Sequence, residues 1–163
     1  GQTPRVFVAH LMHGMGNRLR ALGSAMTFAQ RTNRVLIIIW PLDFHLDAKM
    51  DDLFDIENIE QTPFIVINQF ALSWSDLVVQ GVTQDKAWSS FRLYNYMEIE
   101  KNGALKDEPF VVNEASKSRS IYFKSAYIVK APDEYTNWNA DSQNIRSLKP
   151  SAFVSNVMKE AEE

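Results

Sequence analysis

The chain contains no cysteine, and this absence removes several kinds of chemistry at once. Without thiols there is no disulfide, no thiolate nucleophile and no cysteine-ligated metal. The absence does not decide the cellular compartment, because a cysteine-free chain persists in oxidising and reducing surroundings alike. Its function must therefore be sought in carboxylates, imidazoles, arginines and backbone groups.

The chain also lacks an excess of positive charge and a long hydrophobic run. Seventeen Lys and Arg residues stand against twenty Asp and Glu residues, giving a net charge of −3. No global basic field is present to attract nucleic acid, and we predict no nucleic-acid partner. The longest apolar run, Val35–Leu42, is far too short to span a bilayer, so we predict no membrane span. The 163 residues, 45% of them hydrophobic, suffice for one domain with a sizeable core.

Glycine is scarce, with six residues in all, and two of the six lie in one loop. The loop Met12–Arg20 follows the apolar run Val6–Ala9 and precedes a helical pattern. A strand, a glycine loop and a helix in this order bring backbone amides and a positive helix end to one point, which favours phosphate groups. Gly14 and Gly16 allow the backbone to turn sharply and to approach a ligand closely. This loop is the strongest functional signal in the chain.

Two familiar phosphate-binding motifs do not fit the loop. The dinucleotide fingerprint needs a third glycine where Leu19 stands, and no Gly-Lys-Ser/Thr follows for a Walker P-loop. A tight strand-to-helix turn without a ligand stays open as the alternative.

Hydrophobic periodicity predicts a β-α-β unit at the start of the chain. Arg5–His10 and Val35–Trp40 have strand character, and Asn17–Asn33 has apolar residues at helical spacing, with Asn33 suited to the end of that helix. The crossover of such a unit is right-handed. Further strands are predicted at 64–67, 109–112 and 120–129, a short helix or turn at 47–54, a helical turn at 72–77, an ambiguous strand or helix at 89–100, a loop at 132–147, and a closing helix after Pro150.

This alternation predicts an α/β fold, a three-layer Rossmann-like domain with a mostly parallel sheet. We expect the domain to occupy residues 1–149, and residues 150–163 to form a helix leading away from it.

The first third of the chain resembles the N-terminal region of fucosyltransferase-like glycosyltransferases. The resemblance lies in Gly14–Leu22, then Trp40-Pro41, then Asp52–Phe54, and it is faint at Lys124–Tyr127 and Leu148–Ser151. These enzymes form the two-domain GT-B superfamily that includes the protein O-fucosyltransferases and the α1,6-fucosyltransferases. The resemblance implies that the sheet is the N-terminal half of a GT-B fold.

The resemblance also implies a reaction. Such enzymes transfer fucose from GDP-fucose to a hydroxyl of a glycan or protein acceptor, with inversion and, in many members, without a metal. The donor lies in the cleft between two Rossmann-like domains, and the glycine loop lines that cleft. By this resemblance the donor- or acceptor-binding residues are His13, Gly14, Met15, Gly16, Asn17 and Arg18. Arg18 would stabilise charge on the leaving diphosphate, and Asn17 would hydrogen-bond a sugar or cap the helix.

The resemblance covers one half of such an enzyme. In the superfamily a second domain follows, and a His-x-Arg-type motif early in it supplies an arginine for the donor phosphates. The sequence reaches Glu163 about where that domain would begin, so we expect an acceptor-side half that needs a C-terminal domain for catalysis. The alternative is a non-catalytic transferase-like module that serves as a scaffold or interaction subunit among other proteins. No catalytic residue is assigned.

Polar residues after the second predicted strand are further candidates. Asp43 and His45 follow Trp40-Pro41 at the carboxyl end of that strand, where open α/β sheets bind ligands. They are candidate acceptor-site residues, with a solvated polar loop as the alternative. His13 is a candidate base for a sugar hydroxyl. A metal site would combine His10 and His13 with His45 or Asp43, but their spacing sets no ligand geometry, and no metal is predicted.

Overall fold

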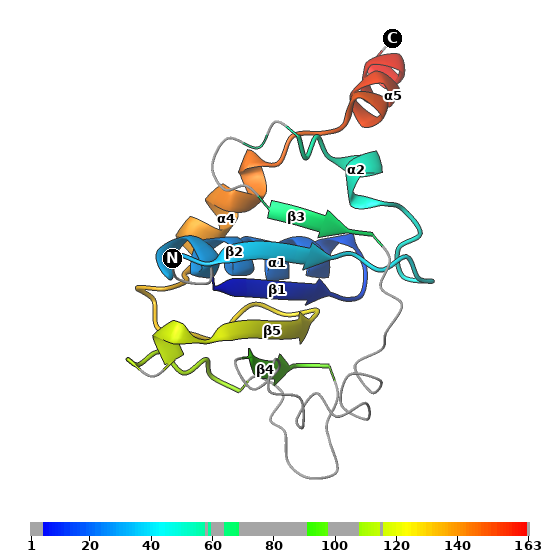
Figure 1. Ribbon diagram of the computed structural model, residues 1–163. Coiled ribbons are helices and arrows are strands. Elements are labelled where there is room, and N and C mark those ends of the chain that lie inside the picture. Colours follow the sequence, from blue (N-terminus) through cyan, green and yellow to red (C-terminus); the bar gives the residue numbers. More distant parts are fainter. Residues whose placement is uncertain are drawn as a thin grey trace.

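A computed structural model describes residues 5–57, 59, 64–68, 91–97, 108–114 and 116–162 of the chain. A five-stranded, all-parallel sheet in the order β3-β2-β1-β5-β4 forms its centre (Figure 1). The strands are β1 (Val6–Leu11), β2 (Val35–Ile39), β3 (Phe64–Ile67), β4 (Phe91–Asn95) and β5 (Ser120–Ser125). The predicted α/β, Rossmann-like class is confirmed.

The opening β-α-β unit forms as the periodicity predicts. Helix α1 (Met15–Arg31) starts two residues earlier than expected and returns the chain to β2, which pairs with β1 in parallel. The helix ends with Thr32 as its C-cap, and Asn33 follows at φ 54°. Asparagine tolerates this left-handed conformation better than most residues, so the predicted role of Asn33 at the helix end is confirmed.

The core lies between the sheet and α1. Phe7, Leu36 and Phe123 come from three neighbouring strands, and each is fully buried in the same cluster as Leu22 and Met26 of α1. Burying side chains of this size is the main favourable contribution to folding, about 1.5–3 kcal/mol for each. Among the described residues, the larger buried cluster lies on the α1-facing side of the sheet.

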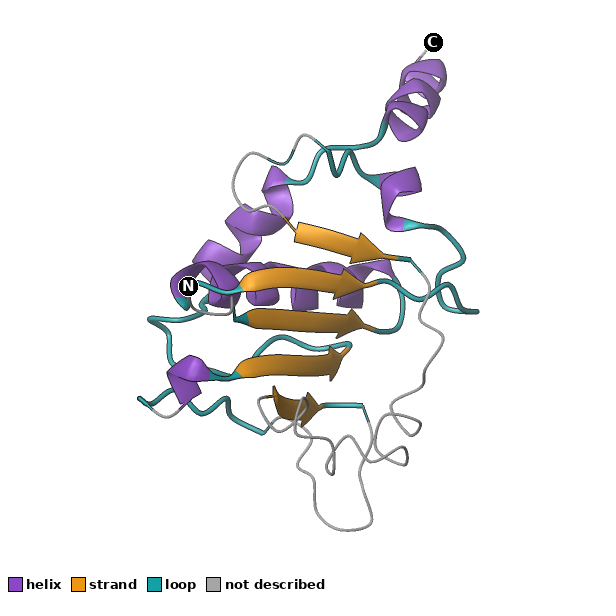
Figure 2. Ribbon diagram, in the orientation of Figure 1, coloured by secondary structure: helices purple, strands orange, loops and turns teal. Residues whose placement is uncertain are grey.

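A second helix, α4 (Trp138–Ser147), packs along α1 on the same side of the sheet (Figure 2). A Cβ added at Gly23 of α1 would lie 2.6 Å from the carbonyl oxygen of Asp141, so the close helix crossing requires glycine there. Asn144 of α4 donates to the Thr27 hydroxyl of α1 at 2.9 Å. The part of the three-layer prediction that concerns helices on the opposite side of the sheet falls outside the described residues.

Two predictions about local structure are wrong. Residues 132–147 were expected to form a loop, but α4 occupies the second half of that segment. Its N-cap Asn137 accepts a hydrogen bond from the Ala140 amide. The buried side of α4 carries Asp141 and Asn144, so the segment lacks an apolar stripe. Residues 109–112 were expected to form a strand, but none forms. The Phe110 ring instead stacks on Tyr94 at 4.0 Å.

The remaining elements agree in part. Strand β5 ends four residues before the predicted limit at 129, and strand β4 (Phe91–Asn95) lies within the ambiguous segment 89–100. Helix α2 (Met50–Leu53) lies inside the predicted segment 47–54, and a 3-10 turn covers Ser116–Ser118. The helical turn expected at 72–77 lies outside the described residues.

The final helix, α5 (Ala152–Glu162), contains no buried residue and projects from the body of the domain (Figure 1). It contacts α2, and Phe54 forms a β-bridge with Pro150 just before it. That this helix leads to a second domain stays a prediction. No helix in the described parts of the chain combines the length and apolar character needed to cross a bilayer.

Candidate functional site

The strand order places a switch point between β1 and β5. From β1 the chain passes through α1 to β2 on one side, whereas β5, much later in the sequence, pairs with β1 on the other side. Loops after the two central strands of such a sheet diverge, and ligands bind in the resulting crevice at the carboxyl ends of the strands. The glycine loop follows β1 at this point, and Met12 is tied to β5 by its amide, which donates to the Ser125 carbonyl at 3.0 Å.

Several of the predicted site residues meet at this edge. The ring centres of His13 and His45 lie 4.8 Å apart, although the two residues come from loops after different strands. The Tyr127 ring, just after β5, lies 6.4 Å from His13. The Phe44 ring packs on His45 at 4.0 Å and is otherwise almost fully exposed. Imidazole and aromatic rings therefore gather where three strands end.

His13 has an unusual backbone conformation. Its φ of 69° lies in the left-handed region, which few residues other than glycine adopt. Such strain persists where surrounding contacts hold it, and it concentrates at ligand sites. The conformation turns the chain from β1 into α1 and places the His13 ring against His45.

Arg18 holds this arrangement from beneath. Its side chain has no exposed surface, and it donates to the carbonyls of His13 at 2.6 Å and Pro41 at 2.7 Å, and to the Asp43 carboxylate at 3.4 Å. Its guanidinium also lies 4.9 Å from the centre of the Trp40 ring. Burial lowers the pKa of Arg18, and the Asp43 carboxylate opposes that shift. The guanidinium thus joins the loops after β1 and β2 and faces protein acceptors rather than the surface.

Asp43 completes the join between the two loops. Besides pairing with Arg18, its carboxylate accepts from the amides of His45 at 2.9 Å and Leu46 at 3.2 Å. The side chain thereby fixes the turn that presents His45. Both residues are brought to the predicted edge, Asp43 in a supporting position and His45 beside the glycine loop.

The glycines of the loop are not explained by contacts within the protein. Gly14, the N-cap of α1, has φ −81°, and a Cβ there would come no nearer than 3.9 Å to its closest neighbour, the His45 carbonyl oxygen. A Cβ at Gly16 would lie 3.5 Å from the Arg20 guanidinium, an ordinary contact with a flexible side chain. Packing requires Gly23 but neither of these two glycines. Close approach of a ligand to the backbone is a remaining reason for them.

The first turn of α1 offers backbone donors to such a ligand. No side chain caps the helix, and its first turn contains no acidic residue. The Asn17 carboxamide oxygen accepts from Arg20 at 2.8 Å, so Asn17 is not used as a cap. The amides of Met15, Gly16 and Asn17 precede the first helical hydrogen bond, from Arg18 to Gly14. These amides and the helix dipole form an electropositive end next to His13.

His10 does not join the cluster around His13. It lies within β1, and its Nδ1 is 2.8 Å from the Tyr122 hydroxyl of β5. Burial, followed by the positive charges of Lys124 and Arg18, lowers the pKa of His10 to about 4. His10 therefore packs within the sheet against a side-chain partner. In the described parts of the chain, no three histidine or carboxylate side chains gather as metal ligands.

Sequence reasoning missed Phe44 and Tyr127 as members of the cluster. Tyr127 lies far from the loop motif in the sequence, and the pairing of β1 with β5 brings it near His13. The fragment Lys124–Tyr127, where the family resemblance is faint, was the one signal that pointed there. No model of a known protein family matches the chain, and no curated protein matches its sequence.

Proposed function

We propose that this chain is the acceptor-side domain of a fucosyltransferase-like glycosyltransferase that uses GDP-fucose. The observation that carries the proposal is the meeting of the motif residues at the switch point of the sheet. His13 and Gly14 follow β1, Asp43 and His45 follow β2, and Arg18 bonds to both loops. Parallel strands alone bring the two loops to one edge, and the bonds from Arg18 to both loops hold them together there.

The geometry suggests how the loop would take part. The free amides in the first turn of α1 suit a phosphate oxygen or a sugar hydroxyl, and Gly14 and Gly16 leave the backbone open to it. Rings at Phe44, His45 and Tyr127 provide faces on which a sugar can pack. Arg18 acts as a positioning residue, because its donors are directed to the loops themselves.

In the proposed reaction an acceptor hydroxyl oxygen bonds to the anomeric carbon of fucose while the bond to the diphosphate breaks. GDP leaves with that electron pair, and the hydroxyl proton passes to a base. An imidazole suits this task near neutral pH, and His13 lies at the loop. The resemblance assigns the phosphate-binding arginine to a second domain, so transfer requires that domain. The domain described here contributes positioning and backbone electrostatics.

Mapping a GDP titration onto backbone amides tests the proposal. We expect GDP to shift the NMR signals of Gly14, Met15, Gly16 and Asn17, with smaller changes at His45. Guanosine without phosphates is the control ligand and should shift the loop amides much less. Absence of shifts in this loop at millimolar GDP, or shifts confined to other parts of the domain, would rule out the site.

The scaffold alternative is favoured by one observation. Helix α5 exposes Phe153, Val157 and Met158, and the first two are one turn apart on the same side of the helix. An apolar stripe on a projecting helix suits a protein partner. If the chain serves only as a scaffold, replacing Phe153 and Val157 with Ser will abolish its association with other subunits, and GDP will leave the glycine-loop amides unchanged.

A further inference from the structure

The amino edge of the sheet contains a second group of charges, far from the glycine loop. Four cationic side chains line one cavity of about 260 Å³: Arg5 before β1, Arg31 at the end of α1, Arg34 before β2, and Lys117 before β5. Strand β1, with six residues, separates this edge from the carboxyl edge by about 20 Å. A ligand here would be distinct from one at His13.

Arg34 is the centre of the group. Only 8% of its surface is exposed, and its guanidinium donates to the carbonyls of Ser116 at 2.9 Å and Arg119 at 2.9 and 3.2 Å. It also lies 5.8 Å from the centre of the Phe28 ring. Among the described residues no carboxylate forms an ion pair with Arg34. Burial lowers its pKa, and the nearby charge of Arg5 lowers it further.

The other cations are not neutralised within the cavity either. Arg5 donates to the Lys117 carbonyl, and Arg31 donates to the carbonyls of Asp133 at 3.3 Å and Glu134 at 3.0 Å. Lys117 pairs with Glu114, but that carboxylate is 88% exposed and does not line the cavity. No Asp or Glu is among the described residues that line it. Backbone carbonyls therefore accept hydrogen bonds but leave the net positive charge in place.

The end of α1 does not cancel this charge. Three of its last four carbonyls accept hydrogen bonds: Phe28 from the Thr32 amide and hydroxyl, Ala29 from the Arg34 amide, and Gln30 from the Asn33 amide. Satisfied carbonyls weaken the negative end of the helix dipole at the cavity.

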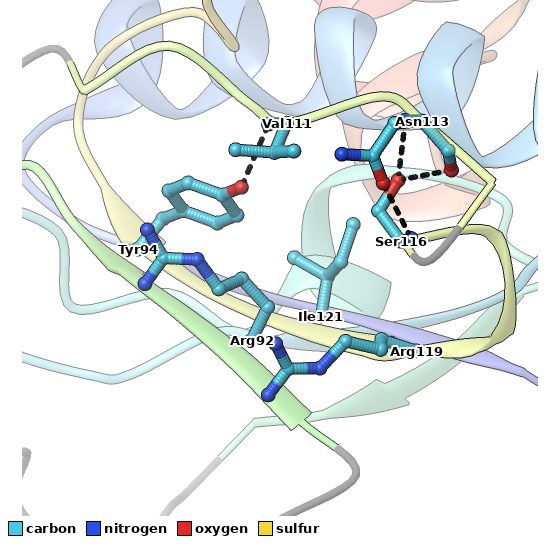
Figure 3. A pocket seen from close by; sticks show the side chains of 7 residues that line it. All are labelled: Arg92, Tyr94, Val111, Asn113, Ser116, Arg119 and Ile121. Carbon is cyan, nitrogen blue, oxygen red and sulfur yellow. Dashed lines mark hydrogen bonds between the residues drawn. The ribbon is translucent and has the colours of Figure 1, made fainter.

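A neighbouring cavity provides an internal contrast. It lies beyond Val111 and Ser116, has about 170 Å³, and presents Arg92 and Arg119 at its rim (Figure 3). There Arg92 forms an ion pair with Glu108. Among the described residues neither cavity has a carboxylate in its lining, and the larger one differs in having four cations against two.

We propose that the cavity between Arg5, Arg31, Arg34 and Lys117 binds the phosphate group of a small phosphorylated molecule. Guanidinium groups from separate elements can fork onto phosphate oxygens, and the hydroxyls of Thr32 and Tyr135 add polar groups to the lining. Partial burial strengthens such contacts relative to those on an open surface. The site is independent of the proposed transferase function and stands if that function fails.

Titration with inorganic pyrophosphate tests the site. Isothermal titration calorimetry should show a binding event in the wild type whose affinity Arg31→Gln weakens about tenfold, because one charge-assisted contact is lost. Arg31 is exposed, so the substitution should leave the fold intact. Arg146→Gln is the matched control: it removes the same charge from the last turn of α4, away from the cavity, and should leave the affinity unchanged.

Amide NMR shifts in the same titration locate the ligand. Shifts at Asn33, Arg34 and Lys117 support the proposal. Absence of binding, equal weakening by Arg31→Gln and Arg146→Gln, or shifts confined to Gly14–Asn17 would overturn it. The last outcome would leave the proposed glycine-loop site standing, so failures of the two proposals are distinguishable.

Discussion

Two buried arginines occupy opposite edges of the sheet, and their surroundings differ. Arg18 at the carboxyl edge has no exposed surface, bonds to two carbonyls and pairs with the Asp43 carboxylate. Arg34 at the amino edge is nearly as buried and also bonds to two carbonyls, but its charged neighbour is Arg5. Each guanidinium lies over an aromatic ring, Trp40 in one case and Phe28 in the other.

The charge of Arg18 is balanced by a carboxylate within the protein, whereas no carboxylate pairs with Arg34 among the described residues. At the carboxyl edge the arginine is neutralised within the protein, which frees the loop above it to present backbone amides and His13. At the amino edge the positive charges exceed the carboxylates that line the cavity. A buried cation whose hydrogen bonds go to carbonyls, with no carboxylate paired to it among the described residues, retains its net charge, which the proposed anion would balance.

Replacing Arg18 should produce the largest effect. Arg18→Met removes three hydrogen bonds and leaves the Asp43 carboxylate and two carbonyls without their donor. We expect the free energy of unfolding to fall by about 3–5 kcal/mol, the range for breaking a buried pair by removing one partner. Urea denaturation measures it. A loss below about 1 kcal/mol would show that Arg18 does not hold the two loops.

The carboxyl edge should also give the domain a pH dependence. His10 titrates near pH 4 in the folded state and near 6.5 when unfolded, so between these values the unfolded chain binds more protons. The free energy of unfolding therefore rises with pH across that window, by about 3 kcal/mol in total. Below pH 4 His10 is protonated in the folded state as well, so it causes no further decrease.

Unfolding free energies from pH 4 to 7 check this expectation. His10→Gln should remove this part of the slope and leave the contribution of the carboxylates. Arg34→Met should keep the full slope, because Arg34 is not among the groups that lower the pKa of His10. An unchanged slope in His10→Gln would contradict a buried, neutral His10.

Replacing Arg34 should cost less than replacing Arg18. Arg34→Met loses hydrogen bonds to Ser116 and Arg119, but it also removes the repulsion between Arg34 and Arg5. Unlike Arg18→Met, it deprives no carboxylate among the described residues of its cationic partner. We expect the free energy of unfolding, measured by urea denaturation, to fall by about 2 kcal/mol. The fall should be smaller at low salt, where the repulsion that the substitution removes is stronger. A loss equal to that of Arg18→Met would end the contrast between the two edges.

The sequence predicts the parts of this domain whose information is local. The strands around 6–11 and 35–39 and the helix between them follow from apolar periodicity, and the glycine loop follows from its place between a strand and a helix. The sharing of one edge by His13 and His45 follows from parallel strands alone. The fucosyltransferase resemblance drew attention to the same residues and stays a proposal.

Other parts depend on pairing between distant segments. Helix α4 was missed because its buried side contains the polar residues Asp141 and Asn144. Their hydrogen-bond partners, Thr136 and Thr27, come together with them only in the folded chain. Arg18 was expected to contact a phosphate, but it is buried against the loop after β2, where it bonds to Pro41 and Asp43. The sequence pattern around Arg18 contains no sign of this distant contact. The pairing of β1 with β5 places Tyr127 near His13. The cationic cavity likewise forms only where the residues that precede β1, β2 and β5 meet.

The smallest effect on stability is expected at Gly16, and it is the most direct test of the central claim that the glycine loop is kept open for a ligand. Gly16→Ala adds a Cβ in ordinary contact with Arg20, so we expect an unfolding free energy higher by up to about 1 kcal/mol. The same Cβ should hinder approach to the loop amides and weaken GDP binding about tenfold. Ser142→Ala on α4 is the control, with GDP affinity unchanged.

Measuring GDP affinity and unfolding free energy together on Gly16→Ala therefore decides the matter. The account predicts that stability rises while affinity falls. Unchanged affinity in Gly16→Ala, or binding lost equally in Ser142→Ala, would contradict it.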